Sequence, residues 1–133
     1  MRRIAFITCV QLGLSCMETI YRIGGRLDLA VTLHDHLAPK KSGRVHIGDF
    51  CSRNDIDLLR IANVNEPVVI DAVVAKQIEW LFIIGWSQIA RSQLLDTPAL
   101  GVLGMHPTLL PEGRGRAPIP WAILNGQIGR AHV

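Results

Sequence analysis

The chain has 133 residues, the length of one domain with room for a substantial hydrophobic core. Hydrophobic residues make up 49% of it and charged residues 19%, which excludes a disordered chain. The net charge of +3 is mild and the basic residues are not interleaved with aromatic ones, so no nucleic-acid surface is predicted. The apolar runs are too short to cross a bilayer. The three cysteines form no CxxC pair and are interpreted as reduced thiols of a cytoplasmic protein.

The first third of the chain predicts two strands joined by a helix. Residues 3–10 form a short apolar run rich in β-branched residues, which indicates a buried strand. Residues 12–23 have helical spacing, and the glycine pair that follows ends the helix. A second strand is predicted at 27–33. Residues 34–43 contain Pro, Lys, Ser and Gly, which predicts a long irregular loop.

The middle of the chain repeats this alternation. A helix is predicted at 45–54 and a weak strand at 57–61. The next helix, at 66–78, carries Pro67 in its first turn, where a missing N–H does no harm. The strongest strand pattern of the chain follows at 80–85.

The last third predicts a short helix at 89–95, a strand at 100–105 and a helix at 119–124. Alternating helices and continuously apolar strands are typical of a Rossmann-like α/β fold, a parallel sheet with helices on both faces. We therefore predict one α/β domain over residues 1–126. In such sheets ligands bind beyond the carboxyl ends of the strands, which directs attention to residues 11–14, 85–92 and 106–118.

An unusual motif follows the last predicted strand. It reads His106-Pro-Thr-Leu-Leu-Pro, then Arg114-Gly-Arg116-Ala-Pro, then a helix that begins with Ile-Pro-Trp-Ala. From the residues alone, His106 is either a core histidine or a functional group at a strand end. The whole motif resembles the signature of folate-dependent formyltransferases, a family that includes methionyl-tRNA, glycinamide ribonucleotide and bacterial sugar N-formyltransferases. The resemblance extends to about residue 126.

The resemblance implies transfer of a formyl group from N10-formyltetrahydrofolate to an amine. His106 falls on the catalytic histidine, which can take a proton from the attacking amine or stabilise the oxyanion. The segment whose backbone contacts the pterin ring of the folate corresponds to Gly85, Trp86, Ser87, Gln88 and Ile89. No metal site is expected.

The short form of the motif favours the sugar N-formyltransferase branch, which implies a nucleotide-linked, dTDP-type amino-dideoxy sugar as acceptor. Lys40, Lys41 and Arg44 form the one local concentration of basic residues and would meet the diphosphate. A solvated loop is the alternative interpretation of this cluster. Arg114 and Arg116 are a second candidate pair for the diphosphate.

Two positions depart from the family pattern. Gly104 stands where the family carries an asparagine that donates to the oxyanion, and Ser87 or Gln88 are the nearest substitutes. Residues 127–133 form a tail that does not resemble the family's continuation, which carries a catalytic aspartate. These departures predict a truncated, inactive chain with an exposed apolar edge, and they leave a homodimer open.

A non-catalytic nucleotide- or folate-binding module is the main alternative. A dinucleotide-binding Rossmann domain is disfavoured because the first strand is not followed by GxGxxG. A serine hydrolase is disfavoured because no GxSxG turn is present, and a zinc site because the His and Cys spacing matches no known ligand set.

Overall fold

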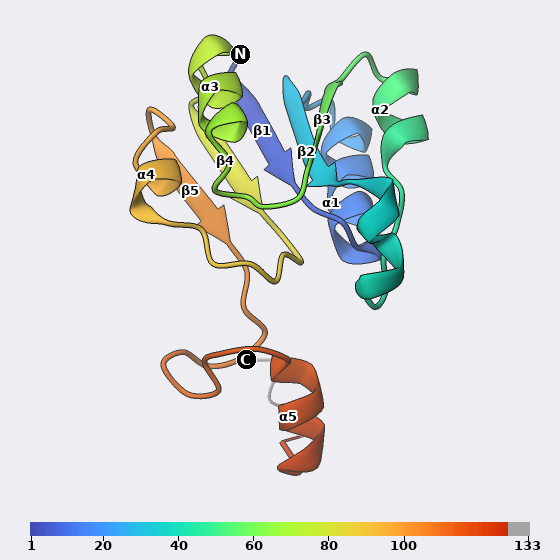
Figure 1. Ribbon diagram of the computed structural model, residues 1–133, viewed down its shortest axis with the longest axis vertical. Coiled ribbons are helices and arrows are strands. Elements are labelled where there is room, and N and C mark those ends of the chain that lie inside the picture. The colour runs from blue at the N-terminus through green and yellow to red at the C-terminus, as the bar shows by residue number, and fades with distance from the viewer. Residues whose placement is uncertain (128–133) are drawn as a thin grey trace.

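The computed structural model describes residues 1–127, which form a parallel sheet in the order β3-β2-β1-β4-β5 (Figure 1). The five strands lie where the apolar runs predicted them, although most are shorter. Their bounds are β1 Ile4–Ile7, β2 Leu29–Leu33, β3 Asp57–Ile61, β4 Trp80–Ile83 and β5 Gly101–Gly104. The predicted Rossmann-like α/β fold is therefore confirmed.

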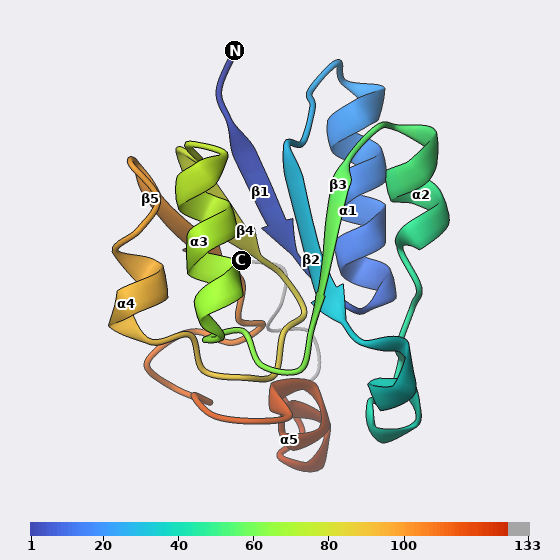
Figure 2. The same ribbon diagram turned by 45° about the horizontal axis from the view of Figure 1, so that its top comes forward.

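Helices cover both faces of this sheet (Figure 2). Their bounds are α1 Gln11–Arg22, η1 Asp35–Lys40 (a 3₁₀-helix), α2 Gly48–Arg53, α3 Pro67–Ala75, α4 Ser92–Leu95 and α5 Pro118–Leu124. One core cluster contains buried residues of α3 and α4, such as Val73 and Leu94. The other contains buried residues of α1 and α2, such as Met17 and Phe50. Burial of β1 and β2 between two helical layers explains why their sequences are almost entirely apolar.

Two predictions about the segment between β2 and β3 were wrong. Part of the predicted irregular loop at 34–43 is the 3₁₀-helix η1. The helix predicted at 45–54 begins only at Gly48. The reason is that Arg44 forms an antiparallel bridge with Val10, and the Val45 N–H donates to the Cys9 carbonyl (2.9 Å). The backbone must be extended to make these contacts.

The order of the strands reverses between β1 and β4. The chain runs from β1 outward to β3 and then returns to the other side of β1. The turns that leave β1 and β4 pack tightly here, because a Cβ added to Gly85 would lie 2.1 Å from Val10 Cγ2. In doubly wound sheets, this reversal point is where ligands bind.

Strand β5 is the sheet edge farthest from β3, and apolar residues near it are exposed. Leu103 on the strand is 48% exposed, and Leu100, just before the strand, is 46% exposed. Helix α5 buries no residue and lies beyond the carboxyl end of the sheet in both views (Figures 1 and 2). An exposed apolar edge is therefore confirmed for the described residues. The predicted tail at 127–133 lies outside them, apart from Gln127. Within residues 1–127, no helix is long and apolar enough to cross a membrane.

Candidate functional site

The predicted catalytic histidine and the predicted folate segment leave the sheet at the same edge. Ile83 of β4 and Gly104 of β5 are paired at the carboxyl ends of their strands. Gly85 and His106 each follow two residues later. Neighbouring parallel strands lie about 4.8 Å apart, so the two segments start side by side. That His106 and residues 85–89 act together in one site stays a prediction.

The imidazole of His106 is held by its own loop. Its Nε2 lies 3.0 Å from the carbonyl oxygen of Gly113, and the side chain is partly exposed. A carbonyl oxygen can only accept, so Nε2 carries the proton of this hydrogen bond. In the neutral ring, Nδ1 then bears the lone pair. Nδ1 has no hydrogen-bond partner among residues 1–127, so it can accept a proton.

Thr108 fixes the loop that orients this ring. Its Oγ1 donates to the Glu112 carbonyl (2.8 Å) and its N–H to the His106 carbonyl (2.9 Å). Gly113 has a φ of +65°, and a Cβ there would lie 2.8 Å from Thr108 Cγ2. Glycine is therefore required at the position whose carbonyl holds the histidine.

The predicted folate segment is a tight turn that is partly anchored and partly exposed. Gly85 has a φ of +66°, and Trp86 packs against the core. Ser87 is exposed, and Ile89 is 85% exposed. The Gln88 amide accepts from the Val64 N–H (2.8 Å) and donates to the Ala62 carbonyl (2.8 Å). Gln88 is therefore held by the loop after β3, whereas Ser87, the other substitute considered for the missing asparagine, is exposed.

The predicted phosphate ligands differ in how accessible they are. The Arg44 side chain is 4% exposed and donates to Thr32 Oγ1 (3.0 Å), the Leu33 carbonyl (2.6 Å) and the Val45 carbonyl. It braces the carboxyl end of β2. Lys40 is exposed and Lys41 half-buried, so these two are the more open members of the cluster. Arg114 and Arg116 are both exposed, in the loop before α5.

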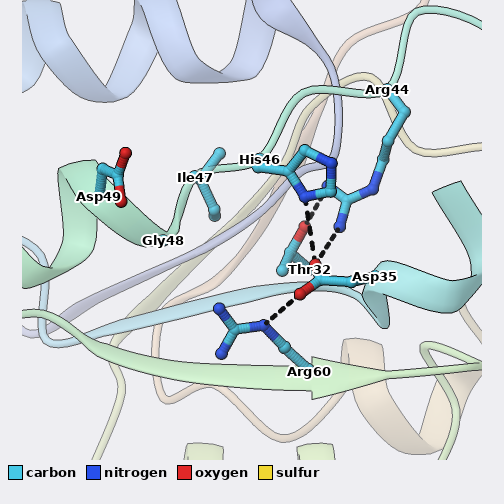
Figure 3. Close-up of a pocket in the computed structure, with 8 residues that line it drawn as sticks. All are labelled: Thr32, Asp35, Arg44, His46, Ile47, Gly48, Asp49 and Arg60. Atoms are coloured by element: carbon cyan, nitrogen blue, oxygen red, sulfur yellow. Dashed lines mark hydrogen bonds and ion pairs between the residues drawn. The ribbon is translucent and has the colours of Figure 1, made fainter.

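A pocket of about 270 Å³ lies beside Arg44, at the carboxyl ends of β2 and β3 (Figure 3). Asp35 lies between three basic groups there. Its carboxylate is 3.1 Å from His46 Nδ1, 3.7 Å from Arg44 Nη2 and 3.8 Å from Arg60 Nε. Sequence reasoning missed Arg60, although it occupies the next-to-last position of β3 and pairs with Thr32. Its place near a strand end is the signal that could have found it.

The described residues support neither a cysteine nucleophile nor a metal site. Burial raises the pKa of Cys51 to about 11, and burial also raises the pKa of Cys9, against the lowering effect of Lys41 and Arg44. Both thiols stay protonated at neutral pH and are poor nucleophiles. Within residues 1–127, no group of three or more His, Cys, Asp or Glu side chains could hold a metal ion.

The reversal of strand order defines a doubly wound α/β protein, a class in which ligands bind beyond the carboxyl ends of the strands. The model of the formyl transferase family matches residues 29–129, and the chain belongs to that family. It is 28% identical over 127 residues to methionyl-tRNA formyltransferase from Acetivibrio thermocellus, covering 94% of this chain and 41% of the relative. The corresponding protein from Pelobacter propionicus is 30% identical over 132 residues, covering 95% and 40%.

Solved structures agree with this fold. Glycinamide ribonucleotide transformylase 1 from Geobacillus kaustophilus matches with a TM-score of 0.75 at 18% identity, covering 95% of this chain and 69% of that one. A formyltetrahydrofolate deformylase from Pseudomonas putida matches with a TM-score of 0.62 at 17% identity, covering 94% and 45%. At this identity the likeness concerns the fold alone. The family prediction is confirmed, whereas these relatives do not support the predicted sugar branch.

Proposed function

We propose that this chain binds N10-formyltetrahydrofolate and supplies the histidine that transfers its formyl group to a primary amine. The observation that supports the proposal is that residues 85–89 and His106 follow β4 and β5, whose carboxyl ends are paired. The chain spans 41% of the Acetivibrio relative, so the activity of a whole protein is part of the proposal. A donor-binding module without catalysis is the alternative.

In the proposed reaction, the amine nitrogen attacks the formyl carbon and forms the new N–C bond. Nδ1 of His106 takes the proton that the amine loses, while Nε2 stays bonded to the Gly113 carbonyl. The imidazolium then lies beside the developing oxyanion and stabilises it. The intermediate collapses by breaking the bond to N10 of the folate, which receives the proton. Gly104 offers no side chain, so the imidazolium carries more of the oxyanion stabilisation.

The acceptor we propose is an amine on a phosphate-bearing molecule. A dTDP-linked amino sugar is the candidate from sequence, and its diphosphate would meet Lys40, Lys41 and the exposed side of Arg60. The names of the relatives favour a second candidate, the aminoacyl end of methionyl-tRNA. Arg44 would act indirectly, because its guanidinium is bonded to the end of β2.

Formyl transfer can be measured as release of tetrahydrofolate from N10-formyltetrahydrofolate, with each acceptor offered separately. The 133-residue chain is compared with a chimaera that adds the remaining length of the Acetivibrio relative. We expect the short chain to turn over slowly or not at all, because the family's aspartate has no match in it. We expect the chimaera to be active.

The decisive comparison uses two histidine variants of the chimaera. His106→Ala should lower kcat by at least about a hundredfold, the usual contribution of a general base. His36→Ala is the matched control, because His36 is an exposed histidine of η1. Equal turnover in the two variants would remove His106 from the reaction.

A further inference from the structure

Two loops that arise from distant strands lie together at the carboxyl edge of the sheet. Residues 62–66 connect β3 to α3, and residues 84–91 connect β4 to α4. Strands β2 and β1 separate β3 from β4 in the sheet. The chain that leaves β3 crosses below these strands and reaches the segment that leaves β4 (Figure 2). No backbone pairing of the sheet requires this meeting, so other contacts must hold the loops together.

Two side-chain amides make the connection. Gln88 donates to the Ala62 carbonyl and accepts from the Val64 N–H, both at 2.8 Å. Asn65 reaches in the opposite direction. It donates to the Ile89 carbonyl at 2.9 Å and accepts from the Arg91 N–H at 2.8 Å. Each amide uses a donor and an acceptor, which no carboxylate or aliphatic side chain of similar size can do.

One side of this connection is rigid. Glu66 Oε1 accepts from the N–H groups of Ala62 (2.9 Å) and Asn63 (2.6 Å), which closes the loop after β3. Val64 in the same loop is fully buried in the core. The loop after β4 is more exposed to solvent. Its Ile89 is 85% exposed, although the Ile89 carbonyl accepts the hydrogen bond from Asn65. The two amides therefore attach an exposed segment to a fixed base.

We propose that Gln88 and Asn65 are positioning residues for the formyl donor, which hold the backbone of residues 85–91 in the conformation that the donor binds. The inference rests on the proposed function, in which residues 85–89 contact the folate. A loop fixed in advance loses less conformational entropy on binding. Removal of either amide breaks both of its hydrogen bonds to the opposite loop, so donor affinity should fall roughly tenfold.

The test uses the 133-residue chain and 5-formyltetrahydrofolate as a stable probe, titrated by calorimetry. Gln88→Met and Asn65→Ala each remove one amide, and Gln88→Glu keeps only the acceptor for the Val64 N–H. Asn54→Ala is the matched control, because the Asn54 side chain donates to the Phe50 carbonyl (2.8 Å) at the end of α2. Hydrogen exchange of the Val64 and Arg91 amides is measured alongside.

We expect roughly tenfold weaker binding in Gln88→Met and in Asn65→Ala, a smaller loss in Gln88→Glu, and unchanged binding in Asn54→Ala. The double variant should lose less than the sum of the two, because both amides fix the same pair of loops. Faster exchange of the Arg91 amide in Asn65→Ala should accompany the loss. Binding equal to that of the Asn54→Ala control would overturn the positioning role while leaving the proposed function standing. A parent chain that binds no probe at all would overturn both.

Discussion

Replacing Gly85 with alanine tests how closely the turns after β1 and β4 pack. At a φ of +66°, the left-handed conformation would be roughly 1–2 kcal/mol less favourable for an alanine than for the glycine. Its Cβ would also lie 2.1 Å from Val10 Cγ2, a distance that forces the neighbouring turn to move. Overpacking of this kind costs typically about 1–3 kcal/mol. We therefore expect Gly85→Ala to lower the free energy of unfolding by about 2–5 kcal/mol.

Gly24 provides the control that separates the two costs. Its φ is +85°, and a Cβ there would have no atom within 4 Å. Gly24→Ala should therefore show the conformational cost alone. Adding Val10→Ala to Gly85→Ala removes the clashing methyl group, since the Val10 Cβ itself would be 3.6 Å away. The double variant should recover most of the overpacking cost.

Urea unfolding followed by circular dichroism measures these differences as shifts of the midpoint at constant slope. Two results would refute the reasoning. One is a Gly85→Ala variant as stable as Gly24→Ala. The other is a Val10→Ala replacement that gives no recovery in the Gly85→Ala background, since it would show that the turns can move apart freely.

Three further predictions concern the buried Arg44, the carboxylate of Glu79 and the thiol of Cys51. Arg44→Ala should lower the free energy of unfolding by about 1–3 kcal/mol, because the carbonyl of the buried Leu33 at the end of β2 loses its guanidinium donor. Lys41→Ala should change it by no more than about 0.5 kcal/mol. The Arg3 backbone N–H and then a neighbouring guanidinium lower the pKa of Glu79. The ionised Glu79 carboxylate therefore stabilises the fold above the usual pKa of a glutamate, and this stabilisation is lost as the pH falls through the lowered pKa of the folded state. Glu79→Gln removes the titrating group, so the free energy of unfolding should decrease less steeply at acid pH. Cys51, with its pKa raised to about 11, should react with iodoacetamide at pH 8 far more slowly in the folded than in the unfolded chain, and equal rates would contradict its burial.

The strands were predictable because burial on both faces leaves a local signal. Residues 80–83 are apolar without interruption, and they form an interior strand of the sheet between β1 and β5. The start of α2 was not predictable in the same way. The apolar residues at 45, 47, 50 and 51 predicted one helix, yet the chain at 44–45 pairs with the segment after β1. Such a contact between residues more than 30 positions apart leaves no trace in local periodicity.

The location of the candidate site was likewise predictable from the sequence, whereas the partners of its side chains were not. The location of His106 and of residues 85–89 at one edge follows from the rule for strand ends, which needs only the order of elements. The partners of Arg44 and Gln88 do not follow from it. A guanidinium fork fits backbone carbonyls as well as phosphates, and a glutamine amide can face a ligand or a neighbouring loop. Only the tertiary fold decides which partner each side chain meets.

The sheet order also sets a distance between the two halves of the proposed site. The pocket with Asp35 and Arg60 lies at β2 and β3, whereas His106 follows β5. Three strand spacings separate β2 from β5, or roughly 14 Å at about 4.8 Å each. An acceptor that places its phosphate in the pocket must extend over this distance to bring its amine to Nδ1 of His106. Under the proposed function, a small amine held by the pocket alone would be too short to reach His106, and the acceptor would have to be an extended molecule.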